Sequence, residues 1–171
     1  MVRPHTKIAG CLITLAVLSY LTYVSLTETW VPILDGANLI FHEAGHWIFF
    51  WGPPLLVAFG GTLAQLLVPF ICAVAYWYQR HLLGTMVALW WFGQNLVNVS
   101  VYVSDARARL LPLLGGDSAG HDWAFILSEL GLLEHDVLIG KWVFFAGAFL
   151  MCGVLLELLS RIVAAREHRF H

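Results

Sequence analysis

A long stretch almost free of charged side chains limits the folding of this chain more than any other feature. Between Ile8 and Ser104 only four residues are charged, namely Glu28, Asp35, Glu43 and Arg80. Charged residues make up 12% of the whole chain and hydrophobic residues 60%, whereas soluble domains contain about 25% charged residues. This composition excludes a soluble globular domain and a disordered chain. It also excludes a nucleic-acid-binding protein, because no cluster of basic residues could hold a phosphate backbone.

Five apolar segments are long enough to cross, or nearly cross, a lipid bilayer, whose hydrocarbon core takes about 20 helical residues. Each must be helical, because an open strand would leave backbone groups unpaired in lipid. The sequence therefore predicts an all-α protein, a polytopic membrane helical bundle in a single domain over residues 1–171, with about five transmembrane helices. The predicted helices cover residues 8–26, 33–51, 55–78, 82–103 and 138–160.

The segment 104–137 is predicted to be the one longer loop. It carries six acidic and two basic side chains, and a loop of this length in a compact protein is typically functional. Within it, residues 123–133 are expected to form a short interfacial helix with Asp122 as its N-cap. The sequence does not fix the orientation, because five spans place five basic residues on one side of the membrane and four on the other.

The string His42-Glu43-Ala44-Gly45-His46 lies within the second apolar segment. Two histidines four residues apart share one face of a helix, so both imidazoles can bind a single metal ion. Glu43 lies one position further round the helix, where it can act as a general base on water activated by zinc. Ionisable side chains are costly inside a membrane and usually mark a functional site. The alternative is that the histidines only form hydrogen bonds between helices.

A catalytic zinc ion needs a third protein ligand. The candidates follow the fourth apolar segment, and they are Asp105, Asp117, His121 and Asp122. Asp105 is favoured, because five spans bring it out on the side toward which His46 points, and His121 is the second choice. Two other interpretations remain open: Asp105 could pair with Arg107 or Arg109, and His121 and Asp122 could form an outer-sphere or loop-capping pair.

Two polar side chains within the apolar segments are further candidates for the site. Gln65 and Asn98 are expected to hold an oxyanion or to position a substrate strand. The alternative role is a hydrogen bond between helices, which is the more common use of such residues in membranes.

Three motifs of the chain resemble those of the site-2 protease family of intramembrane zinc metalloproteases. The first is the His42–His46 string on a membrane helix. The second, Gly61-Thr62-Leu63-Ala64-Gln65, is similar to the Gly-Pro-x-x-Asn motif that follows the zinc helix, with Thr and Gln in place of Pro and Asn. The third, residues 98–105, resembles the Asn…Asp-Gly element that supplies the third ligand, without its prolines and glycine. The resemblance covers roughly residues 33–117.

The resemblance implies an intramembrane zinc peptidase that uses Zn²⁺ and hydrolyses a peptide bond in or near a transmembrane segment of a membrane protein substrate. The chain is also similar to small bacterial membrane proteins with the same string, which implies the bacterial inner membrane as its location. A second hypothesis is a non-catalytic accessory subunit, whose membrane histidines contact a structural metal, a haem or a pigment and which is stable with partner subunits. A third hypothesis, a metal or proton transporter, has less support, since no pair of broken helices is evident.

Overall fold

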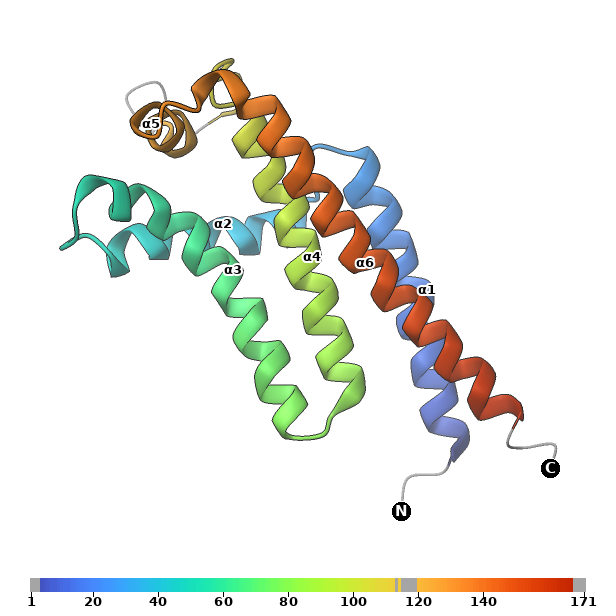
Figure 1. Cartoon of the computed structure of the whole chain (residues 1–171). Coiled ribbons are helices and arrows are strands. Elements are labelled where there is room, and N and C mark those ends of the chain that lie inside the picture. The colour runs from blue at the N-terminus through green and yellow to red at the C-terminus, as the bar shows by residue number, and fades with distance from the viewer. Residues whose placement is uncertain (1–3, 113, 115–119, 168–171) are drawn as a thin grey trace.

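A computed structural model describes residues 4–112, 114 and 120–167 of the chain, and all regular structure in this part is helical (Figure 1). The prediction of an all-α fold is therefore confirmed for these residues. The helices are α1 (Pro4–Thr27), α2 (Pro32–Ile48), α3 (Pro54–Tyr78), α4 (Leu82–Ser104), α5 (Asp122–Glu129), the 3₁₀ helix η2 (Leu133–His135) and α6 (Asp136–Glu167).

Among the described residues, three helical stretches are long and apolar enough to cross a membrane. They are Ala9–Thr27 in α1, Pro54–Tyr78 in α3 and Leu133–Arg166, which includes α6. These stretches indicate a membrane protein, but the prediction of five spans is not confirmed. The second predicted span corresponds to α2, which has 17 residues. At 1.5 Å per residue α2 is about 26 Å long, shorter than the hydrocarbon core of about 30 Å.

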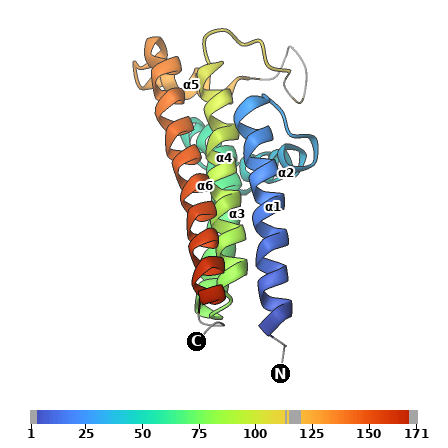
Figure 2. The ribbon, with the colours of Figure 1, turned by 90° about the vertical axis from the view of Figure 1, so that its right-hand side faces the viewer.

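The long helices run side by side, and α2 runs across them. Figures 1 and 2 show α1, α4 and α6 as neighbours, while α3 and α4 form a hairpin whose turn lies toward the same end as both termini. The short α5 lies at the opposite end. Prolines at the first helical positions of α2 and α3 set their starts. The structure thus has two distinct ends, one with the termini and one with α5.

Glycines allow the closest contacts between helices. A Cβ atom built on Gly93 of α4 would lie 3.0 Å from the backbone oxygen of Gly147 in α6, and one built on Gly140 would overlap the hydroxyl of Ser104. Between α2 and α3, a Cβ on Gly45 would overlap the backbone oxygen of Gly60. Small residues at such crossings let backbones approach closely, and this close packing is one of the forces that hold helices together in lipid.

The segment after α4 differs from the expected loop. The short helix α5 begins at Asp122 and ends at Glu129, and its N-cap is His121 rather than Asp122. Four residues of α5 are buried in a core with the ends of α3 and α4, and these are Trp123, Ala124, Ile126 and Leu127. This packing fixes α5 against the bundle, and it places the first residue of α5 beside α2.

Candidate metal centre

Two histidines of α2 and one aspartate of α5 converge on one point. His42 Nε2 lies 3.0 Å from Asp122 Oδ2, and His46 Nε2 lies 3.2 Å from the same oxygen. The three ligand atoms all lie within 4.8 Å of one another. The spacing expected from the sequence thus brings the two imidazoles together on one helix face. The carboxylate that completes the cluster comes from a residue 76 positions further along the chain than His46.

The separations within this cluster fit a zinc ion. Ligand atoms at about 2.0–2.1 Å from a tetrahedral zinc lie about 3.3–3.4 Å from one another. The two nitrogen–oxygen distances, 3.0 and 3.2 Å, are close to this value. Two imidazoles and one carboxylate also form the kind of three-ligand set that catalytic zinc sites use, with a fourth position left for water or substrate.

The Nδ1 atoms of the two rings determine where the lone pairs point. His46 Nδ1 lies 2.8 Å from the carbonyl oxygen of Val57, which can only accept, so this Nδ1 carries the proton. His42 Nδ1 faces Gln65 Oε1 at 3.2 Å and donates to it in the same way. In neutral rings both Nε2 atoms are then acceptors that face the carboxylate of Asp122. Acceptors in this arrangement repel one another unless a cation or additional protons lie between them.

Gly61 of α3 leaves space for the two imidazoles. A Cβ atom at this position would lie 2.6 Å from Nε2 of His42 and 2.7 Å from Nε2 of His46. Any larger residue would therefore push both Nε2 atoms away from the cluster. The motif Gly61–Gln65 thus contributes to the cluster through a glycine, whose lack of a side chain leaves room for the imidazoles. The spacing of the residues in this motif does not reveal that role.

Asp122 is held in place by two neighbouring side chains. The hydroxyl of Tyr102 accepts from the backbone N–H of Asp122 at 3.1 Å and donates to its Oδ2 at 3.3 Å. Next in the chain, the indole of Trp123 donates to the hydroxyl of Thr62 on α3 at 3.1 Å. Contacts of this kind orient metal ligands. Tyr102 was not a candidate in the sequence, and no spacing rule connects it with residue 122.

The pKa of Asp122 shows how strongly the two histidines interact with it. Burial alone raises the pKa of this carboxyl group, but hydrogen bonds from His42 and His46, donated when the rings carry a proton at Nε2 as well, outweigh burial and lower it to about 2. Asp122 is therefore an anion at neutral pH. An anionic oxygen beside two imidazole nitrogens is a suitable donor for a divalent cation.

Asp105 and His121, the two residues favoured from the sequence as third ligand, lie beside the cluster and form hydrogen bonds with nearby backbone groups. Asp105 is the C-cap of α4, and its carboxylate accepts from the backbone N–H groups of Leu110 and Leu111 at 2.9 and 3.0 Å. His121 Nε2 lies 3.4 Å from Asp105 Oδ2, without the geometry of a hydrogen bond. His121 Nδ1 accepts from the N–H of Ala124. Among the described residues, the group that can hold a metal contains Asp122 and neither of these two.

Other contacts of the described residues bear on the remaining interpretations of this region, and the only ion pair of Asp105 among these residues is the one with His121. Arg107 does not pair with Asp105, because its guanidinium binds Asp136 at 2.8 Å and Glu134 at 3.0 Å. Of the proposed capping pair, His121 caps α5 while Asp122 turns toward α2. The candidate Asp117 lies outside the described residues.

Glu43 lies next to the cluster and is available for chemistry. Its side chain is half-buried, and it forms no hydrogen bond or ion pair with any residue that the structure describes. Most half-buried carboxylates in an apolar environment have a partner, because an unpaired charge there is costly. Its position directly after His42 on α2 keeps it near the two imidazoles while leaving its oxygens uncommitted.

Gln65 and Asn98 belong to a buried chain of amides that starts at the cluster. Gln65 accepts from His42 and donates to Asn98 Oδ1 at 2.8 Å, so both ends of its amide are used within the protein. Asn98 also faces the buried carboxyl group of Asp35. Gln65 thus orients the ring of His42 through its Nδ1 atom. The expectation that Gln65 and Asn98 contact substrate stays a prediction.

Asp35 is the other end of this chain of amides. Its carboxylate accepts from the backbone N–H of Val31 at 2.6 Å, from Gln94 at 2.7 Å and from Asn38 at 3.3 Å. Asn38 in turn accepts from the indole of Trp91 at 2.9 Å. These bonds tie α2 to α4 through the interior, where a hydrogen-bonded carboxylate is tolerated and an unbonded one is not.

No family model matches the chain, and searches of curated proteins and of solved structures also gave no significant match.

Proposed function

We propose that the protein is an intramembrane zinc metallopeptidase that hydrolyses a peptide bond in or near a transmembrane segment of another protein. The observation that carries the proposal is the convergence of two imidazole nitrogens and one carboxylate oxygen on one point. Both Nδ1 atoms are bound by acceptors, so both Nε2 atoms are left to bind a cation. Glu43, the one acidic side chain of the motif, adjoins this point without a partner among the described residues.

Each residue then has a distinct role. Zn²⁺ would be held by His42, His46 and Asp122, and it would supply the Lewis acidity that activates water at neutral pH. Glu43 takes the proton from the attacking water and returns it to the leaving amine. Tyr102 holds Asp122 in position, and Gln65 holds the ring of His42. The chain itself thus supplies binding, orientation and proton transfer.

The substrate class follows from where the cluster lies. The helix that carries both histidines exposes large apolar side chains on its outer face, with Ile40 69% and Trp47 79% exposed. In a bilayer such a face contacts lipid or another apolar helix rather than water. A peptide segment that reaches the cluster past this face would itself be apolar, which favours a membrane protein substrate and partner.

The metal content of purified protein tests the proposal directly. We expect near one zinc ion per chain in detergent-purified protein, and its loss in His46→Ala, because two ligands cannot replace three. Elemental analysis after dialysis against a weak chelator measures both. Protein without metal, or His46→Ala protein with unchanged metal content, contradicts the zinc site, provided that circular dichroism shows both chains to be helical.

The accessory-subunit hypothesis makes different demands on the histidines. A haem or pigment metal would need an open face at Nε2 of an imidazole, whereas Asp122 Oδ2 lies 3.0 and 3.2 Å from the two Nε2 atoms. The geometry therefore favours a small cation over a large cofactor. An absorption spectrum of the purified chain distinguishes the two, since a bound haem or pigment absorbs visible light and zinc does not.

We infer that the chain crosses the membrane four times rather than five. The start of α1 and the end of α6 lie at the same end of the bundle (Figures 1 and 2), which requires an even number of spans. The fourth span is α4, whose 23 residues measure about 35 Å and whose polar side chains Gln94 and Asn95 are buried. In this arrangement α2 and α5 both stay near the end opposite to the termini.

Four spans also give the basic residues a clear asymmetry. In the sequence, the segments that flank the end with the termini contain six Lys and Arg residues, namely Arg3, Lys7, Arg80, Arg161, Arg166 and Arg169. The end near α5 carries three, Arg107, Arg109 and Lys141. The positive-inside rule then places the termini in the cytoplasm and the metal cluster toward the opposite face of the membrane, which we expect to be the bacterial inner membrane.

Reporter fusions test this topology. We expect a cytoplasm-active reporter such as green fluorescent protein to be fluorescent at the N-terminus, at the C-terminus and in the α3–α4 turn after Gln79. We expect a reporter that works only outside the cytoplasm, such as alkaline phosphatase, to be active when inserted at Gly52 or Gly120. Activity on opposite sides for the N- and C-terminal fusions would restore an odd number of spans.

A further inference from the structure

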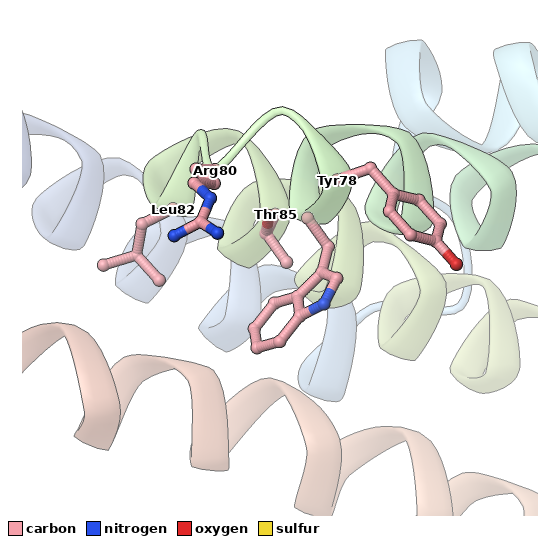
Figure 3. Close-up of a pocket in the computed structure, with 5 residues that line it drawn as sticks. Tyr78, Arg80, Leu82 and Thr85 are labelled. Carbon is pink, nitrogen blue, oxygen red and sulfur yellow. The ribbon is translucent and has the colours of Figure 1, made fainter.

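A cleft far from the metal cluster opens between the α3–α4 hairpin and α6. One part, of about 460 Å³, is lined by Trp77, Tyr78, Arg80, Leu82 and Thr85 (Figure 3). A second part, of about 310 Å³, continues along α6 past Phe149 and Gly153 to Arg161. The two parts share Trp77, Leu82 and Thr85, so they form one elongated cleft. Its walls are mostly apolar, and its basic residues lie at the end near the termini.

The backbone conformation at Arg80 is one that favours glycine rather than arginine. The N–H of Arg80 donates to Trp77 O and the N–H of His81 donates to Tyr76 O, both at 2.9 Å. This pair of bonds ends α3 in a Schellman motif, whose left-handed position is usually a glycine. Arg80 occupies that position with φ of 55°. Glycine would adopt this left-handed conformation without strain. The presence of arginine at this position therefore indicates a role for its side chain.

The charges around the cleft leave Arg80 as its uncompensated cation. Arg161 is paired with Glu157 at 2.6 Å, one turn earlier on α6. Arg80 forms no ion pair with any residue that the structure describes. The side chains of Arg80 and Leu82 extend from the α3–α4 turn into the same opening (Figure 3). One guanidinium without an ion pair among the described residues therefore stands at the mouth of an apolar cleft, and guanidinium binds phosphate in a bidentate manner.

We propose that this cleft binds one anionic phospholipid, with the headgroup phosphate at Arg80 and an acyl chain along α6 toward Phe149. Arginine at the bilayer surface, exposed aromatic side chains such as Trp77 and Tyr78, and an apolar channel toward the membrane interior match the three regions of a phospholipid. The site is independent of the metal cluster, because the cleft and α5 lie at opposite ends of the bundle.

The lipid that accompanies the protein from mixed vesicles tests the headgroup contact. The full chain is reconstituted in vesicles of four parts phosphatidylcholine to one part phosphatidylglycerol, extracted in mild detergent, and its retained lipids are quantified by mass spectrometry. We expect phosphatidylglycerol to be enriched over its share in the vesicle. In Arg80→Gln the ratio of retained phosphatidylglycerol to retained phosphatidylcholine should fall about fivefold, the factor for one basic side chain near a charged surface.

Two further variants separate the headgroup, the acyl chain and overall charge. Arg166→Gln makes the same charge change near the end of α6 outside the cleft lining, and it should keep the enrichment. Gly153→Phe fills the cleft where an added Cβ meets open space, so the fold should tolerate it while total retained lipid falls. Excess inorganic phosphate should not compete, since it lacks the acyl chain.

Several outcomes overturn the proposal. Wild-type protein with lipids in the vesicle's own ratio shows that no anionic lipid is selected. Equal enrichment in Arg80→Gln and Arg166→Gln shows that Arg80 makes no specific contact. Unchanged retention in Gly153→Phe, or displacement of the lipid by phosphate alone, shows that no acyl chain lies in the cleft.

Discussion

Replacing Asp122 with alanine should remove zinc from the protein. Loss of an outer-sphere partner of a metal ligand already lowers affinity by about 10- to 100-fold, so loss of the ligand itself should lower it by more than about 100-fold. The variant also loses the hydrogen bond from Tyr102 to Asp122 Oδ2. Titration of the purified chain with a zinc indicator, with wild type measured in parallel, gives the ratio of the two affinities.

The matched control for this variant is Asp105→Ala. Asp105 accepts two backbone N–H groups after α4, and among the described residues it is outside the metal-binding group. Its replacement should loosen the turn at the end of α4 while leaving zinc bound. The opposite pattern, with zinc lost in Asp105→Ala and kept in Asp122→Ala, would support the ligand set favoured from the sequence and contradict the geometry described above.

Glu43→Gln should abolish peptide-bond cleavage while leaving zinc in place. A general base contributes about 10²- to 10⁴-fold to a rate, and glutamine keeps the size of the side chain without its basicity. Zinc should remain, because Glu43 is not one of the three converging ligands. Cleavage is measured on a library of transmembrane peptides in detergent micelles, with products identified by mass spectrometry, and metal content is measured on the same sample.

Glu28→Gln is the control for Glu43→Gln, since Glu28 is exposed beyond the end of α1. It should cleave at the wild-type rate. Equal cleavage by wild type and Glu43→Gln would remove Glu43 from the mechanism. Zinc binding without cleavage in any of the three chains would leave the metal site intact and exclude the peptidase reaction on these peptides, which distinguishes a failed function from a failed site.

The buried polar side chains show why some roles could be predicted and others not. The hydrogen bond between Gln65 and Asn98 could not be predicted from their neighbours in the sequence, because 33 positions separate the two residues. Their polarity within apolar segments did mark them as unusual. Tyr102 gave no such signal, because a tyrosine near the end of an apolar helix is common at membrane interfaces. Its contact with Asp122 depends on how α5 returns to α4.

The choice of third ligand illustrates the same limit. Asp105 was favoured because a five-span topology puts it near the histidines. That topology assumed that every apolar segment crosses the membrane, whereas α2 runs across the long helices (Figure 1). The burial of Trp123 and Ile126 against α3 and α4 then fixes the start of α5, with Asp122, beside α2. Hydrophobicity and length alone do not distinguish a helix that crosses a bilayer from one that lies within the bundle.

Local physical chemistry in the sequence by itself determined the helical fold, the membrane character and the shared face of His42 and His46. Scarce charge forces apolar helices to pair their own backbone groups, and a spacing of four residues aligns side chains within any α-helix. Only the tertiary structure decided that Asp122 completes the cluster, that Gly61 leaves room for it and that the terminal helices end together. These features depend on contacts between segments far apart in the chain, whose geometry is set by packing.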